Sequence, residues 1–354
     1  MAKSFAKTLE KDSLYLDLEL PSDVQKLAEP ELFLRTNQAK CIIVDEVQLK
    51  PDLFPLIRAL VDEDRIPLRF ILLGSATPDI IRDSSESLAG RISYLHLQPF
   101  SRVETPEIAL SRHHFFGGFP LSILAKSDKQ AIRWLDDFIN IYITRDLPIL
   151  GMPASPQTTR RLWEMLAWQN GNLLNSSSIG NSLGISNHTV NTYMDFLEGA
   201  FMLHRIKAYA VNLKKRIVKA PKIYLTDTGL LHRLLRLDSF DALFGSPMLG
   251  ASWEAFVLNQ IMAVKPDNMD IFFYRTHAGT EVDIVLTKAL KPVSSIEVKF
   301  TSTPKVTKGF LNGIDDLETK KNFIIIPIDD EYPLRENISA IGLDRFLSEL
   351  EKGF

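Results

Sequence analysis

Two neighbouring carboxylates stand directly after a short apolar run near the start of the chain. Asp45 and Glu46 follow the segment Cys-Ile-Ile-Val. An aspartate at the end of a buried strand is a typical ligand of Mg²⁺, and a glutamate beside it can orient or deprotonate an attacking water molecule. The pair therefore indicates the metal-handling part of a site that hydrolyses a nucleoside triphosphate.

Two further groups follow in the order that such a site requires. Ser75, in Gly-Ser-Ala-Thr, can sense a γ-phosphate from the end of the next strand, and Arg91 can donate charge to a phosphate. Phosphate binding also needs a glycine-rich loop, G-x-x-x-x-G-K-[ST], before the Asp–Glu strand. Only 40 residues precede Cys41, and the first glycine is Gly74. We therefore expect Mg²⁺ and ATP as cofactors, with weak ATP affinity because the loop is missing.

A second constellation lies in the last third of the chain. Residues on a strand alternate between its faces, so Glu297 and Lys299 share one face. Asp283 is expected on the adjacent strand and Glu254 on a preceding helix. Carboxylates with a strand carbonyl can hold Mg²⁺, and the lysine can stabilise charge on a phosphate. This pattern indicates a metal-dependent nuclease. A Glu–Lys pair on a solvated strand face and an inactive nuclease-like fold are the alternatives.

Basic residues concentrate in one segment of a slightly acidic chain. Between Phe201 and Lys222 there are seven Lys or Arg residues and no Asp or Glu, whereas the whole chain has a net charge of −3. Such a run suits the phosphate backbone of DNA. The candidate DNA-binding residues are Lys207, Lys214, Lys215 and Arg216. The preceding helix is polar rather than basic, so binding of a partner protein is the alternative.

Alternating strand and helix patterns must position the first site. Strand-like segments at 13–18, 40–44, 69–73 and 92–97 are separated by amphipathic segments such as 53–60. Continuous Ile, Leu and Val runs are typical of strands buried on both faces of a parallel sheet. Ligands bind at the carboxyl ends of strands in such sheets, which is where Asp45 and Glu46 stand.

The middle of the chain is predicted to be helical. A stripe of apolar residues predicts a helix over 130–147, near whose end Arg145 is expected in a salt bridge rather than on a phosphate. Helices at 160–169, from 175 and at 187–197, followed by strands at 201–208 and 216–217 around a wing at 211–215, suit a winged helix. Beyond it we expect a helix at 253–264, a hairpin of 271–275 and 281–287, strands at 295–300 and 322–328, and a helix at 343–350.

The amino-acid composition is typical of a soluble globular protein. Apolar residues make up 45% and charged residues 24%, which is ordinary for a soluble globular protein. No apolar run approaches the length of a membrane span, and no membrane partner is expected. The single cysteine, Cys41, excludes an internal disulfide and suits the reducing cytoplasm.

Several motifs together resemble one family. The chain is similar to bacterial and archaeal AAA+ ATPases that carry a C-terminal domain of unknown function; the similarity rests on Val44-Asp-Glu-Val-Gln48, Leu53-Phe-Pro-Leu56, Leu73-Gly-Ser-Ala-Thr77, Ser85-Glu-Ser-Leu-Ala-Gly-Arg91, Tyr142-Ile-Thr-Arg-Asp-Leu147 and Tyr224-Leu-Thr-Asp-Thr-Gly-Leu230. The resemblance implies that a first strand and the phosphate loop precede Lys40 by a few tens of residues. It places that strand between the Asp–Glu strand and the Gly-Ser-Ala strand.

The opening residues resemble the later part of the helix that follows the phosphate loop. Phe5 and Leu9 have the i, i+4 spacing of one helix face. We therefore expect a chain that starts inside the first helix of its ATPase domain, through a misassigned start codon or a shortened gene. A complete N-terminal helix is the alternative.

The C-terminal constellation is similar to the PD-(D/E)XK nucleases, although Val282 stands where proline usually precedes the aspartate. The expected fold is multidomain α/β, with an incomplete AAA+ parallel sheet (1–104), a helical connector (105–152), a winged helix (153–238) and a nuclease-like domain (239–354). The expected function is an ATPase-family ATP-binding protein that does not hydrolyse ATP alone. A metal-dependent DNA nuclease and a non-enzymatic DNA- or protein-binding protein are the alternatives. Action of Arg91 in trans would require a homo-oligomer.

Overall fold

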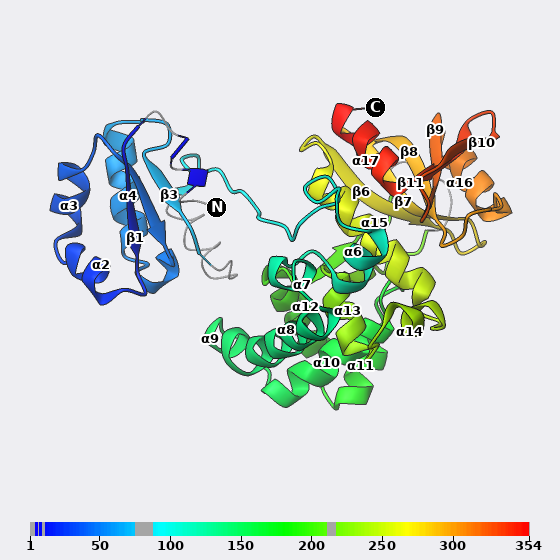
Figure 1. The fold of residues 1–354 in the computed structure, drawn as a ribbon, viewed down its shortest axis with the longest axis horizontal. Coiled ribbons are helices and arrows are strands. Elements are labelled where there is room, and N and C mark those ends of the chain that lie inside the picture. The colour runs from blue at the N-terminus through cyan, green and yellow to red at the C-terminus, as the bar shows by residue number, and fades with distance from the viewer. Residues whose placement is uncertain (1–3, 6, 9–10, 75–87, 211–216, 354) are drawn as a thin grey trace. The chain divides into compact units, whose positions relative to one another are not determined.

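The chain folds as two compact units that divide between His96 and Leu97 (Figure 1). The structure is a computed structural model that describes residues 4–5, 7–8, 11–74, 88–210 and 217–353. Most of the expected N-terminal helix, Leu9 included, lies outside these residues. In the described part of the chain, no helix combines the length and the apolar character needed to cross a membrane.

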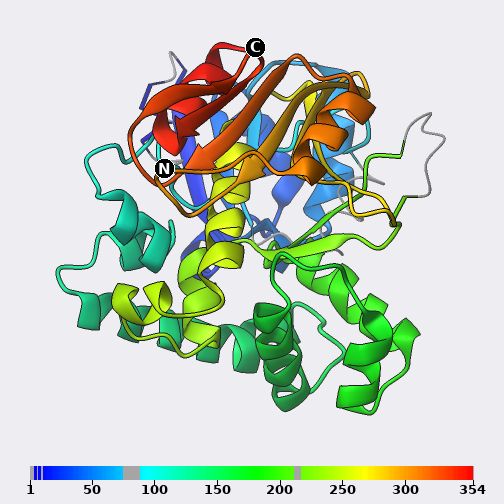
Figure 2. The same cartoon turned by 90° about the vertical axis from the view of Figure 1, so that its right-hand side faces the viewer.

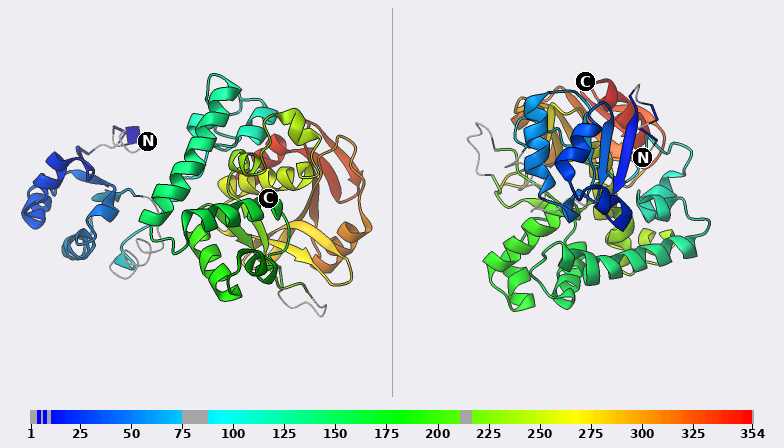
Figure 3. Two further views of the ribbon diagram at one scale, coloured as in Figure 1. Left: turned by 90° about the horizontal axis from the view of Figure 1, so that it is seen from below. Right: turned by 90° about the vertical axis from the view of Figure 1, so that its left-hand side faces the viewer.

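The N-terminal unit is a parallel three-stranded sheet with helices between its strands (Figure 3, right). The strands are β1 (Ser13–Asp17), β2 (Cys41–Asp45) and β3 (Phe70–Leu72), in that order. The connections contain α2 (Pro21–Lys26), α3 (Pro30–Thr36), a 3₁₀ turn (Val47–Leu49) and α4 (Leu53–Glu63). Buried Leu16, Ile42 and Ile57 pack in one core, because α4 turns its apolar stripe to the sheet. The expected α/β layer is therefore confirmed.

Two expectations about this sheet were wrong. Residues 92–97 form no strand, and Leu95 is 96% exposed. The strand that the family resemblance placed between β2 and β3 has no space there, because β2 and β3 pair directly. Ile42 lies opposite Phe70, and the amide of Leu73 donates to the carbonyl of Val44 at 2.8 Å. Adjacent strands at hydrogen-bond distance leave no room for a third.

The second unit begins with a helical region. Its helices are α6 (Leu110–Phe116), α7 (Pro120–Ile123), α8 (Asp128–Ile141), a π-helical turn (Tyr142–Asp146), α9 (Leu147–Ile149), α10 (Pro156–Trp168), α11 (Ser176–Leu183) and α12 (Asn187–Gly199). Side-chain oxygens cap the N-termini of four of them, from Ser127, Ser155, Asn175 and Ser186. Arg145 pairs with Asp146 at 2.6 Å, as expected.

A strand pair follows these helices, with a partner that differs from the expected one. β4 (Leu203–Ile206) pairs antiparallel with β5 (Lys222–Leu225), so that Ile206 lies opposite Lys222. The expected partner, residues 216–217, is not part of β5: Ile217 forms an isolated bridge with Thr276. Residues 211–216, which include the expected wing, lie outside the described residues.

The C-terminal part contains a mixed six-stranded sheet with helices on it. α13 (Thr228–Leu234), α14 (Phe240–Phe244) and α15 (Leu249–Val264) precede β6 (Met269–Arg275), β7 (Glu281–Lys288) and β8 (Lys291–Val298). Then come α16 (Lys308–Leu317), β9 (Lys321–Ile326), β10 (Glu331–Arg335), β11 (Ile338–Gly342) and α17 (Leu343–Lys352). The strand order is β10-β11-β9-β8-β7-β6. The expected hairpin and strands are present, whereas α16, β10 and β11 were not anticipated.

The helical region and the C-terminal sheet form one body. Figure 2 shows α15 running from the helices to the sheet, where its buried residues pack with those of α17. The chain after β4 also joins the edge of β6, because Tyr209 donates its amide to the carbonyl of Phe273 at 2.7 Å. Val218 donates to Arg275 at 3.1 Å. Tyr209 and Val218, which lie on either side of the expected wing, are therefore both hydrogen-bonded to β6.

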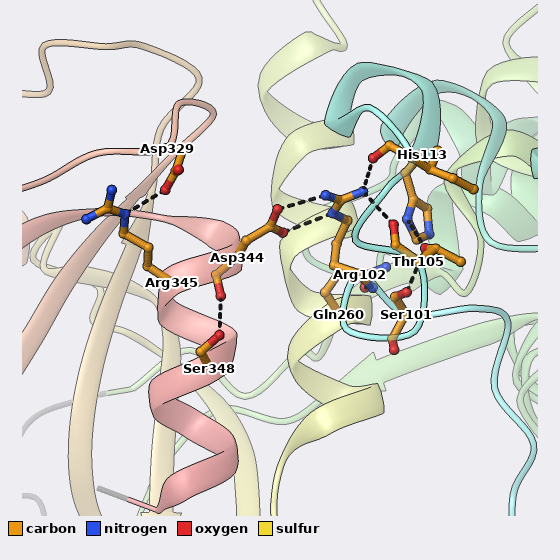
Figure 4. A network of polar contacts seen from close by, with 10 residues as sticks. Ser101, Arg102, Thr105, His113, Gln260, Asp329, Asp344, Arg345 and Ser348 are labelled. Atoms are coloured by element: carbon orange, nitrogen blue, oxygen red, sulfur yellow. Dashed lines mark hydrogen bonds and ion pairs between the residues drawn. The ribbon is translucent and has the colours of Figure 1, made fainter.

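Buried Arg102 fixes the start of the second unit to its end (Figure 4). Its guanidinium pairs with Asp344 at the start of α17, at 2.9 and 2.7 Å, and donates to the carbonyl of Ile108 at 2.5 Å. Its own amide donates to the side chain of Gln260 on α15 at 2.7 Å. The segment around Arg102 thus belongs to the second unit.

Candidate functional site

Asp45 and Glu46 lie at the carboxyl end of β2, the middle strand of the N-terminal sheet. The hydroxyl of Tyr15, on β1, donates to the carboxylate of Asp45, and the amide of Glu46 donates to it at 3.1 Å. This hydrogen bond to Asp45, followed by burial, raises the pKa of Tyr15 to about 12. Glu46 has a left-handed backbone with φ of 55°, and its carboxylate accepts from Gln48. Both carboxylates are therefore oriented by neighbouring groups.

Two other residues, Ser75 and Arg91, were expected at the site of the Asp45–Glu46 pair. Ser75 lies outside the described residues. The guanidinium of Arg91 pairs with Asp62 on α4, at 2.6 and 2.9 Å, and this contact raises the pKa of Arg91. Asp62 was not anticipated, because a charged residue on the exposed face of an amphipathic helix carries no local signal of its partner. The phosphate-contacting role of Arg91 stays a prediction.

The N-terminal carboxylates fit a magnesium ion. Mg²⁺ in nucleotide sites is held by one or two carboxylates, with phosphate oxygens and water completing its shell. Asp45 and Glu46 are half-buried oxygen donors at a strand end and meet this requirement. The phosphate-gripping motif does not occur within the 354 residues of this sequence.

The C-terminal candidates meet at one cavity of about 510 Å³. Glu254 reaches it from α15, Asp283 from β7 and Glu297 from β8, with Lys299 immediately after β8. The antiparallel register of β7 and β8, in which Ile284 lies opposite Ile296, brings the two strand carboxylates next to each other. The convergence expected from strand alternation is therefore present in the structure.

Glu297 is the most deeply buried carboxylate of the strand pair. Its Oε1 accepts from Lys299 at 3.0 Å and from the hydroxyl of Thr307 at 3.3 Å. Its Oε2 is buried without a hydrogen-bond partner, and burial is the main reason why the pKa of Glu297 is raised. Asp283 is held differently, since its Oδ2 accepts the amide of Val298 at 2.9 Å.

Another ionisable group, which was not anticipated, lines the cavity. Lys222, the first residue of β5, is 2% exposed. Its Nζ lies 3.0 Å from Glu254 Oε1, 3.2 Å from Glu281 Oε1 and 3.6 Å from Asp283 Oδ1. The hydroxyl of Tyr224 also donates to Glu254 Oε1, at 2.5 Å. In the sequence Lys222 is simply the last member of the basic run, and no local pattern distinguishes it from a surface lysine.

The carboxylates of this cavity do not fit the predicted Mg²⁺ role. Within the described ranges, no group of three or more His, Cys, Asp or Glu side chains is arranged to hold a metal ion. Glu254 and Asp283 instead surround the ammonium group of Lys222. A divalent cation would have to share these oxygens with a buried positive charge, which like-charge repulsion disfavours.

The basic run is partly used inside the protein. Arg205 pairs with Glu198 and with Asp195, the latter at 2.6 Å, and Lys222 is buried among carboxylates. Lys207 is exposed, whereas the other three candidate DNA-binding residues, Lys214, Lys215 and Arg216, lie outside the described residues. DNA contact by this segment stays a prediction.

Comparisons with known protein families match three consecutive regions of the chain. The AAA domain family matches residues 1–105. Two domains of unknown function, DUF8612 and DUF4143, match residues 107–241 and 249–346. No solved structure matches the chain.

Three relatives carry no assigned function. Uncharacterized proteins of Mycobacterium tuberculosis and Mycobacterium bovis are each 37% identical over 332 residues, which is 94% of this chain and 75% of the relative. An uncharacterized protein of Haemophilus influenzae is 24% identical over 229 residues, 59% of this chain and 55% of that protein. This chain belongs to the same family as the mycobacterial proteins, with an AAA domain followed by two domains of unknown function.

Proposed function

We propose that this chain is an AAA-family nucleotide-binding protein in which Asp45 and Glu46 handle Mg²⁺ and the attacking water. The observation that carries this proposal is the position of the pair at the carboxyl end of the middle strand of a parallel sheet. Ligands bind at this edge of open α/β sheets. The match of residues 1–105 to the AAA domain family supports the same assignment.

The chain's own groups would prepare this site for a nucleotide. Asp45 would hold Mg²⁺, which neutralises charge on the phosphates when it is bound. The Tyr15 hydroxyl and the Glu46 amide orient the Asp45 carboxylate. Glu46 would act as the base for water, Ser75 as the sensor of the γ-phosphate and Arg91 as the arginine that stabilises charge. Arg91 would have to leave Asp62 to do so, and a neighbouring subunit that supplies it in trans would imply a homo-oligomer.

We further propose that these 354 residues do not hydrolyse ATP by themselves. The backbone amides and the lysine that cradle the β- and γ-phosphates in such sites belong to the motif G-x-x-x-x-G-K-[ST], which the sequence does not contain. Those groups would have to come from residues outside this sequence or from another chain.

Nucleotide titration tests both statements. Binding of ATP with Mg²⁺ to the purified chain is measured by calorimetry, and phosphate release is followed in parallel. We expect a dissociation constant weaker than about 1 mM, loss of that binding in Asp45→Ala, and no phosphate release. Asp52→Ala is the matched control, since Asp52 is 67% exposed in the same unit. Micromolar binding by this chain, or binding that Asp45→Ala leaves intact, would contradict the proposal.

The second candidate function belongs to the C-terminal cavity. The convergence of Glu254, Asp283, Glu297 and Lys299 favours a nuclease-like activity, whereas Lys222 among the carboxylates counts against dependence on Mg²⁺. Mg²⁺- or Mn²⁺-dependent cutting of DNA that disappears in Lys299→Ala would support the nuclease. If no substrate is cut with either metal, the non-enzymatic DNA- or protein-binding alternative is favoured.

DNA binding without cleavage has its own measurement. If the basic run contacts DNA, Lys207→Glu should weaken the binding of a labelled duplex, and the affinity should fall steeply as salt is raised. Arg205→Gln is a weaker test, because Arg205 is already paired with Asp195 and Glu198.

A further inference from the structure

We infer that Lys222 is the resident cation of the C-terminal cavity. Its ammonium group takes the place among Glu254, Glu281 and Asp283 that a divalent metal ion would need, so this cavity holds no divalent ion in the wild-type protein. The nucleotide-binding role of the N-terminal unit is independent of this site.

Three carboxylates surround the ammonium group. Nζ donates a hydrogen bond to Glu254 Oε1 at 3.0 Å and forms ion pairs with Glu281 Oε1 at 3.2 Å and Asp283 Oδ1 at 3.6 Å. Nζ also lies 5.7 Å from the ring centre of Phe273, which closes one side. A buried charge persists only when it is paired in this way.

The charge state of Lys222 is secured by its partners. Burial by itself would lower the pKa of Lys222, but the carboxylates of Glu254, Asp283 and Glu281 outweigh burial, so the pKa is raised. In return, Lys222 opposes the effects of burial and of Asp283, which raise the pKa of Glu254. The three carboxylates around Nζ therefore stabilise the charged form of Lys222.

The residues of this site come from the two regions of the chain that match domain families of unknown function. Lys222 and Tyr224 lie in the region matched by one domain of unknown function, whereas Glu254, Asp283 and Glu297 lie in the next. β5 brings Lys222 to the cavity because its pairing with β4 fixes it beside α15 and β7. Glu297 Oε2 remains a buried acceptor without a hydrogen-bond partner at the wall of this cavity.

Manganese binding tests the assignment, with Mn²⁺ as a paramagnetic probe of the intact chain. Every variant also carries Asp45→Ala, which removes binding by the N-terminal carboxylates. In this background we expect no bound Mn²⁺ at about 1 mM. Lys222→Met should gain one Mn²⁺ with an affinity at least about tenfold higher, because the competing charge is removed. Adding Asp283→Asn to Lys222→Met should abolish the gain.

Lys222→Arg is the matched control, because arginine keeps the positive charge and should leave the site free of metal. The assignment would be overturned if the background protein bound one Mn²⁺ that Asp283→Asn removes, or if folded Lys222→Met gained none. If Lys222→Met folds only when Mn²⁺ is added, the metal has replaced the lysine, which supports the assignment. If that variant does not fold at all, the comparison of the background protein with its Asp283→Asn form decides.

Discussion

Lys222 Nζ lies 3.0 Å from Glu254 Oε1. Lys222 is the first residue of β5, which follows the helical region, whereas Glu254 is on α15, which packs against the C-terminal sheet. Both side chains are largely buried, at 3% and 16% exposure. This ion pair and the Tyr224 hydroxyl on the same carboxylate oxygen link the two parts of the second unit.

Removal of this lysine should destabilise the second unit. Lys222→Met leaves Glu254 and Asp283 close together without a counter-charge, and breaking a buried pair in this way costs about 3–5 kcal/mol. Urea unfolding monitored by tryptophan fluorescence measures the loss. The double variant Lys222→Met with Glu254→Gln should recover part of it, because one uncompensated charge is gone. Equal stability of wild type and Lys222→Met would show that the pair contributes nothing.

Arg102 should matter far more than the arginine next to its partner. Arg102→Met removes the pair between a buried guanidinium and the half-exposed carboxylate of Asp344, and leaves the carbonyl of Ile108 without its donor. The expected loss is about 2 kcal/mol. Arg345→Met is the control, because its pair with Asp329 is exposed and should contribute nothing measurable (Figure 4). Thermal unfolding of the two variants provides the comparison.

Buried histidines should make the protein sensitive to acid. Burial lowers the pKa of His113, His204 and His232 to about 4, and lowers that of His114 well below its usual value. The unfolded chain therefore binds protons near pH 6.5, whereas the folded chain does not. Stability from these groups is fully present above pH 6.5 and falls as the pH drops toward 4, by up to about 3 kcal/mol for each of His113, His204 and His232.

Asp227 has the opposite effect on the pH dependence of stability. Burial raises its pKa to about 6, so its contribution to stability is full below the unfolded value near 3.8 and is lost as the pH rises through 6. Four histidines outweigh one carboxyl group, and the net stability should fall from pH 6.5 to pH 4. Urea titrations at several pH values measure the slope. His204→Asn should reduce it, and a slope unchanged in that variant would contradict the assignment of His204.

Two glycines should respond oppositely to alanine. Gly117, which ends α6 with φ of 70°, would carry a Cβ only 2.1 Å from Asp227 Oδ1, so Gly117→Ala should cost at least about 2 kcal/mol. Gly250, in α15, would meet no atom within 4 Å, and Gly250→Ala should stabilise the helix by up to about 1 kcal/mol. Differential scanning calorimetry distinguishes the two signs.

Elements with a clear local pattern were predictable from the sequence. The apolar stripe of α8, the capping residue Ser186 before α12 and the alternation of β7 and β8 each specify a local structure, because helix and strand periods are written in neighbouring residues. The same alternation sufficed to bring Glu297 and Lys299 to one face and Asp283 beside them.

Only the tertiary structure decided which distant segments pair. The direct contact of β2 with β3 and the choice of β5 as the partner of β4 depend on how buried surfaces fit, and no local pattern encodes this fit. The salt bridge from Arg91 to Asp62 joins residues 29 positions apart, which no local pattern encodes either. Lys222 is the sharpest case. Its neighbours in sequence are those of an exposed basic segment, whereas strand pairing buries it among carboxylates, and burial with charge complementarity determines its chemistry.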